Sequence, residues 1–158
     1  MKCRPVLVAC ALLLAPLVSA QAAAPSSEVL KRGEYLVRIG GCNDCHTPGY
    51  GEKLGVMPVA EWLTGVPVGY RGPWGTTYAA NLRLSMSKLT EEQWLQQARL
   101  PRLPPMPFWA LKDMTDADLR AMYQFVRSLG VAGTAMPAAV SPGGQVKTPV
   151  IDFVPHAP

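Results

Sequence analysis

The sequence has few residues that could bind a metal ion. Its 158 residues include four cysteines and two histidines. A structural zinc site needs about four ligands. After Cys45 and His46, the chain offers only His156 and no further cysteine. This shortage argues against a zinc site, and a thiol redox pair would not need the histidine.

Long hydrophobic runs are also scarce. The apolar run Val6–Val18 is shorter than the about 20 residues that span a membrane as a helix. A basic start at Lys2 and Arg4 precedes this run, and the small residues of 19–22 follow it. That order is typical of a cleaved secretory signal peptide. We therefore expect residues 1–22 to be a signal peptide and the mature protein to be periplasmic, without a membrane span; an uncleaved anchor is the alternative.

Removal of this segment would change the composition of the chain. Cys3 and Cys10 would leave with it, and both remaining cysteines belong to the motif described next, so no disulfide bond is expected. The chain has 15 basic and 11 acidic residues, and without Lys2 and Arg4 the net charge is +2. No basic stripe is present, which argues against nucleic-acid binding. The remaining about 135 residues suffice for one domain.

The most informative stretch is Cys42-Asn43-Asp44-Cys45-His46. Two thiols three positions apart, followed directly by a histidine, are typical of a c-type haem attachment site. On one tight turn, both cysteines can form thioethers to the vinyl groups of one porphyrin, and the histidine can turn its imidazole toward the iron. We predict one covalent haem c, held by Cys42 and Cys45, with His46 as the proximal iron ligand.

Several segments carry helix signals. Ser27 is a plausible N-cap of an amphipathic helix that ends at Gly40-Gly41. Gly33 lies on the apolar face of this helix, where the close approach of another helix could compensate for its cost of about 1 kcal/mol. Two capping-box patterns, at 90–93 and 115–118, predict a helix from Glu91 to about Arg99 and a last helix. The last helix has an apolar stripe of Leu119, Met122, Tyr123, Val126 and Leu129.

The remaining segments are rich in glycine and proline. Residues 47–70 indicate a loop with a short helix over Pro58–Thr64, and we expect residues 131–158 to form an extended tail after a haem-binding domain over 27–130. The segment 71–78 is also predicted to be a loop. Its rings could simply fill the core, or it could wrap the haem edge. In the second case the haem propionates would be buried, and buried carboxylates need hydrogen-bond donors. The candidate donors are Arg71, Trp74, Tyr78 and Asn81.

The second axial ligand of the iron decides the kind of function. A methionine there raises the reduction potential and closes the iron to oxygen or peroxide. After removal of the signal peptide the candidates are Met57, Met86, Met106, Met114, Met122 and Met136. Met106 is flanked by Pro104-Pro105 and Pro107, which can hold a loop rigid. We predict that Met106 is the ligand; Met86, which has no evident structural role, is the competitor.

Four further stretches accompany the haem motif: Arg32–Leu36, Gly72–Leu82, Leu103–Trp109 and Met114–Leu119. Together they resemble the class I cytochrome c family, and more closely the cytochrome subunits that accompany periplasmic alcohol, aldehyde and related dehydrogenases. The resemblance implies an all-α, cytochrome c-like fold in which the N- and C-terminal helices pack around one haem, with His46 and Met106 as axial ligands. Many relatives have two or three such units, whereas this chain has one motif.

These observations predict an electron-transfer protein rather than an enzyme. We expect a periplasmic monohaem cytochrome c that takes single electrons from a periplasmic dehydrogenase and passes them to an oxidase or another cytochrome. The alternative is a haem enzyme of the peroxidase or thiosulfate-oxidising type, which would require an exchangeable sixth ligand. A subunit that only anchors a partner is a third possibility.

Overall fold

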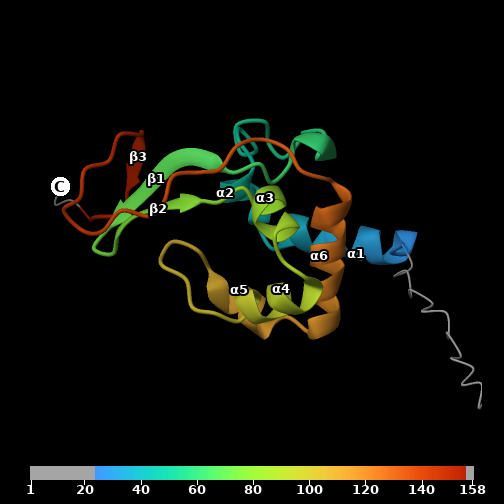
Figure 1. Cartoon of the computed structure of the whole chain (residues 1–158). Coiled ribbons are helices and arrows are strands. Elements are labelled where there is room, and N and C mark those ends of the chain that lie inside the picture. The colour runs from blue at the N-terminus through green and yellow to red at the C-terminus, as the bar shows by residue number, and fades with distance from the viewer. Residues whose placement is uncertain (1–23, 156–158) are drawn as a thin grey trace, which may run out of the picture.

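The computed structural model describes residues 24–155. The predicted signal peptide, residues 1–22, lies outside the described residues. Between residues 24 and 155, no helix is long and apolar enough to cross a lipid bilayer. A helical part and a small sheet lie next to each other along the molecule (Figure 1).

The first and last helices of this part of the chain pack across each other (Figure 1). They are α1 (Ser27–Ile39) and α6 (Asp116–Ser128). The helices approach closely at Gly33, where an added Cβ would lie only 2.1 Å from the carbonyl oxygen of Ala121. The prediction that another helix crosses at Gly33 is therefore confirmed.

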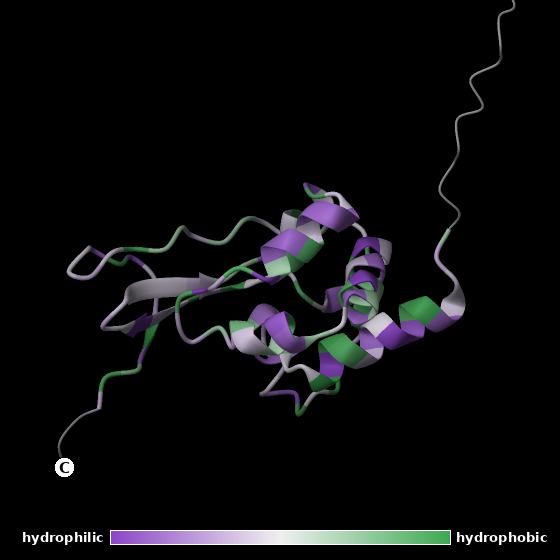
Figure 2. Cartoon of the chain, turned by 90° about the horizontal axis from the view of Figure 1, so that it is seen from below, coloured by the Kyte–Doolittle hydropathy of each residue, from purple (hydrophilic) through white to green (hydrophobic). Residues whose placement is uncertain are grey.

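Short polar side chains begin the longer helices. Ser26, one residue before the predicted N-cap, accepts a hydrogen bond at the start of α1. Thr90 and Gln93 form the predicted capping box of α4 (Glu91–Ala98), and Thr115 caps α6. The three longer predicted helices are thus confirmed to within one or two residues. Each combines hydrophobic and hydrophilic residues, as the mixed colours along the ribbons show (Figure 2).

Shorter helical segments connect these elements. They are α2 (Cys42–His46), α3 (Leu82–Ser87), α5 (Phe108–Asp113) and a single 3-10 turn, η1 (Val59–Glu61). The helix predicted over Pro58–Thr64 is therefore only this turn. Glycine and proline surround it, and both residues shorten helices.

The expectation of an all-α fold is incomplete, because the structure also contains a three-stranded sheet. Strands β1 (Val66–Gly72) and β2 (Gly75–Ala79) form an antiparallel hairpin, and β3 (Val150–Asp152) pairs in parallel with β1. The segment 71–78, which was predicted to be a loop, is thus mostly strand. Valine, threonine and tyrosine favour strands, but the glycines and prolines between them hid this signal in the sequence.

The proline-rich tail is extended, as expected, and is fixed to the sheet. The Arg71 guanidinium donates two hydrogen bonds to Asp152, at 2.6 and 2.7 Å. The ring of Phe153 lies 6.1 Å from the rings of both Tyr70 and Trp74. These contacts explain why the tail follows the hairpin instead of leaving the domain (Figure 1).

Candidate haem-binding site

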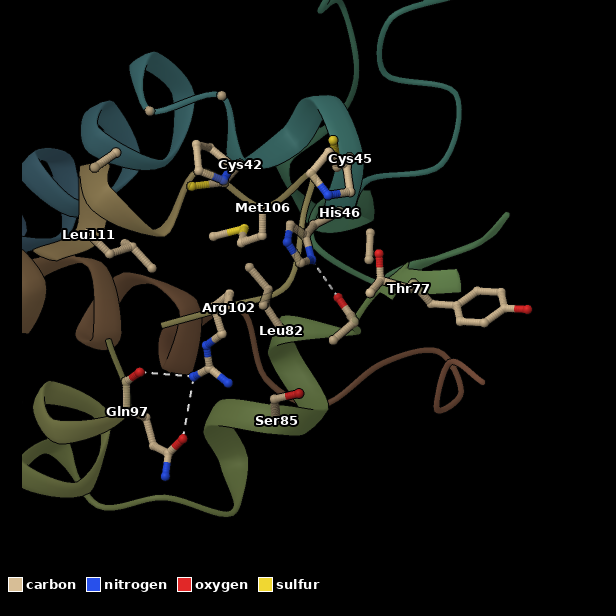
Figure 3. Close-up of a pocket in the computed structure, with 18 of the residues that line it drawn as sticks. Cys42, Cys45, His46, Thr77, Leu82, Ser85, Gln97, Arg102, Met106 and Leu111 are labelled. Atoms are coloured by element: carbon tan, nitrogen blue, oxygen red, sulfur yellow. Dashed lines mark hydrogen bonds between the residues drawn. The ribbon is translucent and has the colours of Figure 1, made fainter. Parts of the chain in front are cut away.

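A cavity of about 610 Å³ lies between the helical part and the hairpin. Its volume is within the range of about 300–1,000 Å³ that is usual for small-molecule and cofactor sites. The haem motif on α2, the helices α3 and α4, strand β2 and the proline-rich segment before α5 all contribute to its wall (Figure 3). Most of the wall is apolar and includes Val37, Leu82, Met86, Leu89, Leu111, Met114, Met122 and Val126.

The haem motif forms one short helix at the wall of this cavity. Gly41 precedes it with a φ of 68°, in the left-handed region that glycine favours. Cys42 and Cys45 are both unpaired and both line the cavity. Burial raises the pKa of the Cys42 thiol to about 11. The structure therefore brings two thiols of one helical turn to the same cavity.

A buried hydrogen-bond chain holds this helix against the following segment. The Thr47 hydroxyl donates to the Asn43 side-chain oxygen at 2.7 Å and accepts from the Leu63 backbone amide at 2.8 Å. Asn43, Thr47 and Leu63 are almost completely buried. These hydrogen bonds join α2 to a segment that is distant in sequence, and they therefore fix the orientation of the two cysteines toward the cavity.

His46 also faces the cavity, and its ring is oriented by the backbone. Its Nδ1 lies 2.7 Å from the carbonyl oxygen of Ala80 (Figure 3). A carbonyl can only accept, so Nδ1 carries the proton. Burial lowers the pKa of His46, although the bond to Ala80 opposes this shift. The neutral ring thus keeps the lone pair of Nε2 available for a metal ion.

Four of the six candidate methionines line the cavity. Met86, Met106, Met114 and Met122 belong to its wall, whereas Met57 and Met136 do not. Met86 and Met122 are almost fully buried, with 1% and 2% of their surface exposed, and pack in the core. Proximity to the cavity therefore does not by itself distinguish Met106 from Met86.

Met106 differs from Met86 and Met122 in its backbone, because those two residues lie within α3 and α6. It follows the cis peptide bond between Pro104 and Pro105, and its carbonyl accepts a hydrogen bond from the Phe108 amide at 2.8 Å. Met106 lies on this connection, and Met114 follows the end of α5, so both side chains can adjust their position without breaking helical hydrogen bonds. Figure 3 shows Met106 and His46 at the same cavity.

The residues predicted to bind propionates are scattered. Tyr78 lines the cavity, but its hydroxyl pairs with Thr148 at 2.8 Å. Arg71 and Trp74 do not belong to the described wall, and the guanidinium of Arg71 pairs with Asp152. The structure does not bring these two residues to the site.

Asn81 lies behind the wall and has a structural role. Its side-chain oxygen caps α3 by accepting from Leu84, and its amide donates to the carbonyl oxygens of Ala132 and Thr134 in the tail. It is absent from the described wall of the cavity. Conversely, Gln97 and Arg102 do line it and were missed. Arg102 stands four residues before Met106, and this proximity was the one sequence signal that could have suggested Arg102.

The residues around the cavity fit a covalently attached tetrapyrrole. The wall is mostly apolar, two free thiols face it from one turn, and a neutral imidazole presents an unprotonated nitrogen beside them. A zinc site would need further ligands, and no cluster of three or more histidine, cysteine or acidic side chains suited to a metal ion occurs among the described residues. The donor set therefore agrees with haem c.

Comparison with known proteins gives the same result. No family model matches the sequence, and no solved structure matches it. The chain is 30% identical over 108 residues to the cytochrome c subunit of alcohol dehydrogenase (quinone) from Gluconobacter oxydans (strain 621H), which is 61% of this chain and 20% of that protein. The corresponding subunits of Gluconacetobacter polyoxogenes and Komagataeibacter europaeus are each 26% identical over 136 residues, or 79% of this chain and 27% of each relative.

The chain thus spans only about a fifth to a quarter of the length of these curated relatives. The matched length nevertheless includes most of this chain. The chain is therefore a distant homologue of the cytochrome c subunits of quinone-dependent alcohol dehydrogenases.

Proposed function

We propose that this protein is a periplasmic monohaem c-type cytochrome that transfers single electrons and does not itself catalyse a reaction. One observation carries the proposal: two unpaired thiols, a neutral imidazole and a loop methionine meet at one mostly apolar cavity. The homology to cytochrome c subunits supports it. The haem would supply an iron that cycles between its ferrous and ferric states.

The residues of the chain have separate roles in this proposal. Cys42 and Cys45 attach the cofactor, and His46 binds the metal through Nε2 while Ala80 holds the ring. Met106 would supply a thioether ligand to the metal and would prevent other ligands from reaching it. The apolar wall excludes water, which stabilises the less charged, ferrous state and so raises the reduction potential.

The relatives support the choice of a dehydrogenase as electron donor. Those proteins are subunits of quinone-dependent alcohol dehydrogenases, so we propose a periplasmic dehydrogenase as donor and an oxidase or another cytochrome as acceptor. Export by the segment 1–22, a haem-binding domain over 27–130 and a tail over 131–158 are parts of the same proposal. Copurification from the native host would identify the dehydrogenase.

Visible spectroscopy of the purified, exported protein tests the iron ligands. We expect the reduced α-band of thioether-linked haem and, in the oxidised protein, the weak sulfur-to-iron band of methionine ligation. Met106→Ala should abolish the weak band, whereas Met86→Ala, the matched control at the same cavity, should retain it. The reverse result would reject Met106 as ligand.

The same preparation distinguishes an electron-transfer protein from the alternative, a haem enzyme. A protein built only for electron transfer should bind cyanide or carbon monoxide slowly at neutral pH, because Met106 occupies the sixth position. Rapid binding by the unmodified protein would instead favour a haem enzyme with an exchangeable ligand. Mass spectrometry that finds no tetrapyrrole on the exported chain would reject both.

A further inference from the structure

The described wall of the cavity contains a single permanently charged side chain. That residue is Arg102, and no aspartate or glutamate belongs to the wall as far as the structure describes it. The cavity is otherwise lined by apolar groups and a few neutral polar ones. A lone guanidinium beside an apolar cavity attracts an anion, since no carboxylate of the chain neutralises it there.

Most polar groups of the wall already have partners within the protein. The Thr77 hydroxyl donates to the Pro104 carbonyl, the Ser85 hydroxyl donates to the Asn81 carbonyl, and the Trp94 indole donates to Leu119. The hydroxyl of Tyr78 pairs with that of Thr148. These groups therefore have little capacity left for a carboxylate ligand.

Arg102 and Gln97 are different. One terminal nitrogen of Arg102, Nη2, donates to the Gln97 carbonyl at 2.9 Å and to its side-chain oxygen at 3.3 Å. Within the described chain, Nε and Nη1 of Arg102 and Nε2 of Gln97 have no hydrogen-bond partner. The two oxygens of Gln97 also hold the guanidinium against α4, so that the other N–H donors of Arg102 stay at the cavity wall (Figure 3).

The position of this pair matches the chemistry of haem. Both thioether bonds form at the two vinyl groups, and the two propionates project from the opposite half of the porphyrin ring. Figure 3 shows Arg102 and Gln97 across the cavity from Cys42 and Cys45. A porphyrin attached to the cysteines would therefore direct its carboxylates toward the side of the cavity where these donors lie.

We propose that Arg102, held by Gln97, binds the propionate carboxylates of the covalently attached haem. This inference rests on the proposed haem function and assigns the anion-binding part of the same site. Arginine matches a carboxylate with two parallel N–H···O bonds, and the oxygens of Gln97 fix the position of the guanidinium. Arg71, whose guanidinium is paired with Asp152, has no part in this contact.

The pair has a second consequence for the iron. A positive charge near the porphyrin disfavours the ferric form, which carries one more positive charge than the ferrous form. Loss of the guanidinium would also leave a propionate charge uncompensated, which favours the ferric form. Both effects have the same sign, so removal of Arg102 should lower the reduction potential.

The test compares Arg102→Gln with Lys112→Gln in the full, exported chain. Lys112 is an exposed cation on α5 outside the described cavity wall, so the two variants lose the same charge. Three quantities are measured: covalent haem per chain by mass spectrometry, the propionate bending mode by resonance Raman spectroscopy, and the midpoint potential by titration. We expect both variants to carry one haem, and only Arg102→Gln to shift the propionate mode and lower the midpoint potential.

Two further variants cover a failure of Arg102→Gln to accumulate. Arg102→Lys should keep the charge but lose the paired geometry, giving a shifted propionate mode with a smaller change in potential. Gln97→Leu should shift the same mode to a lesser extent. If all these variants had the same spectra and potentials as Lys112→Gln, the assignment of Arg102 would be overturned, but the proposed haem function would stand. Absence of haem from the unmodified protein would overturn the proposed function itself.

Discussion

The crossing of α1 and α6 can be tested by one added methyl group. In Gly33→Ala the new Cβ would lie 2.1 Å from the Ala121 carbonyl oxygen and 2.6 Å from Phe125 Cβ, whereas ordinary contact begins at 3.4 Å. The nearest obstacle is backbone, so a change of rotamer cannot relieve it. The two helices must therefore separate by about 1 Å at the crossing.

The magnitude follows from two opposing effects. Alanine stabilises a helix interior by about 1 kcal/mol relative to glycine. Overpacking of a core costs typically about 1–3 kcal/mol, and a gap of about 0.5–1 Å loses a quarter to a half of each dispersion contact. The buried side chains of Leu36, Val37 and Phe125 lie in this region. Because the clash is with backbone, we expect a net loss of about 2 kcal/mol, or roughly 8 °C in Tm.

Thermal and chemical unfolding of the haem-loaded protein, followed by far-UV circular dichroism, measure this loss. Gly51→Ala is the control, because nothing lies within 4 Å of its added Cβ and its backbone is not in the left-handed region. It should change the free energy of unfolding by less than about 0.5 kcal/mol. A Gly33→Ala protein as stable as the wild type, or more stable, would refute the close packing of the two helices.

Two further predictions concern charged side chains. Arg83 is 7% exposed and donates to the carbonyl oxygens of Ala60, Leu129 and Gly130. Arg83→Leu leaves these buried acceptors without donors and should lower the free energy of unfolding by about 3 kcal/mol. Urea titration measures this loss, and an unchanged unfolding midpoint would contradict the role of Arg83. The hydrogen bond from Arg32 lowers the pKa of Asp118 below its ordinary value of 3.8. The ionised Asp118 therefore stabilises the folded protein above pH 3.8, and this stabilisation is lost as the pH falls through the lowered pKa. Asp118→Asn should therefore be less stable than wild type at neutral pH and equally stable in strong acid; parallel curves of stability against pH would count against the pair.

Local signals in the sequence were sufficient for the haem motif and the longer helices. The spacing of Cys42, Cys45 and His46 depends only on one turn of chain, and the structure places all three side chains at one cavity. Thr90 and Thr115 begin α4 and α6 because a cap needs only the next three residues. Such signals act between near neighbours, so they can be read without knowledge of the fold.

Pairing between distant residues was not predictable in this way. Strand β3 joins β1 across about 80 residues, through contacts such as Arg71 with Asp152. The sequence suggested Arg71 as a propionate donor because it lies on a segment that could wrap the haem edge, where buried carboxylates need donors. The tertiary structure instead uses its guanidinium to fix the tail.

The sequence alone therefore determined the chemistry that the chain can offer: two thiols and an imidazole on one turn, several methionines, and helices able to cross. The tertiary structure decided which of the other side chains reach the cavity, including four methionines and the pair Arg102 and Gln97. The physical reason is that a helix cap or an attachment motif involves a few consecutive residues. A cavity wall depends on how segments far apart in the chain pack together, and single-residue patterns do not record that packing.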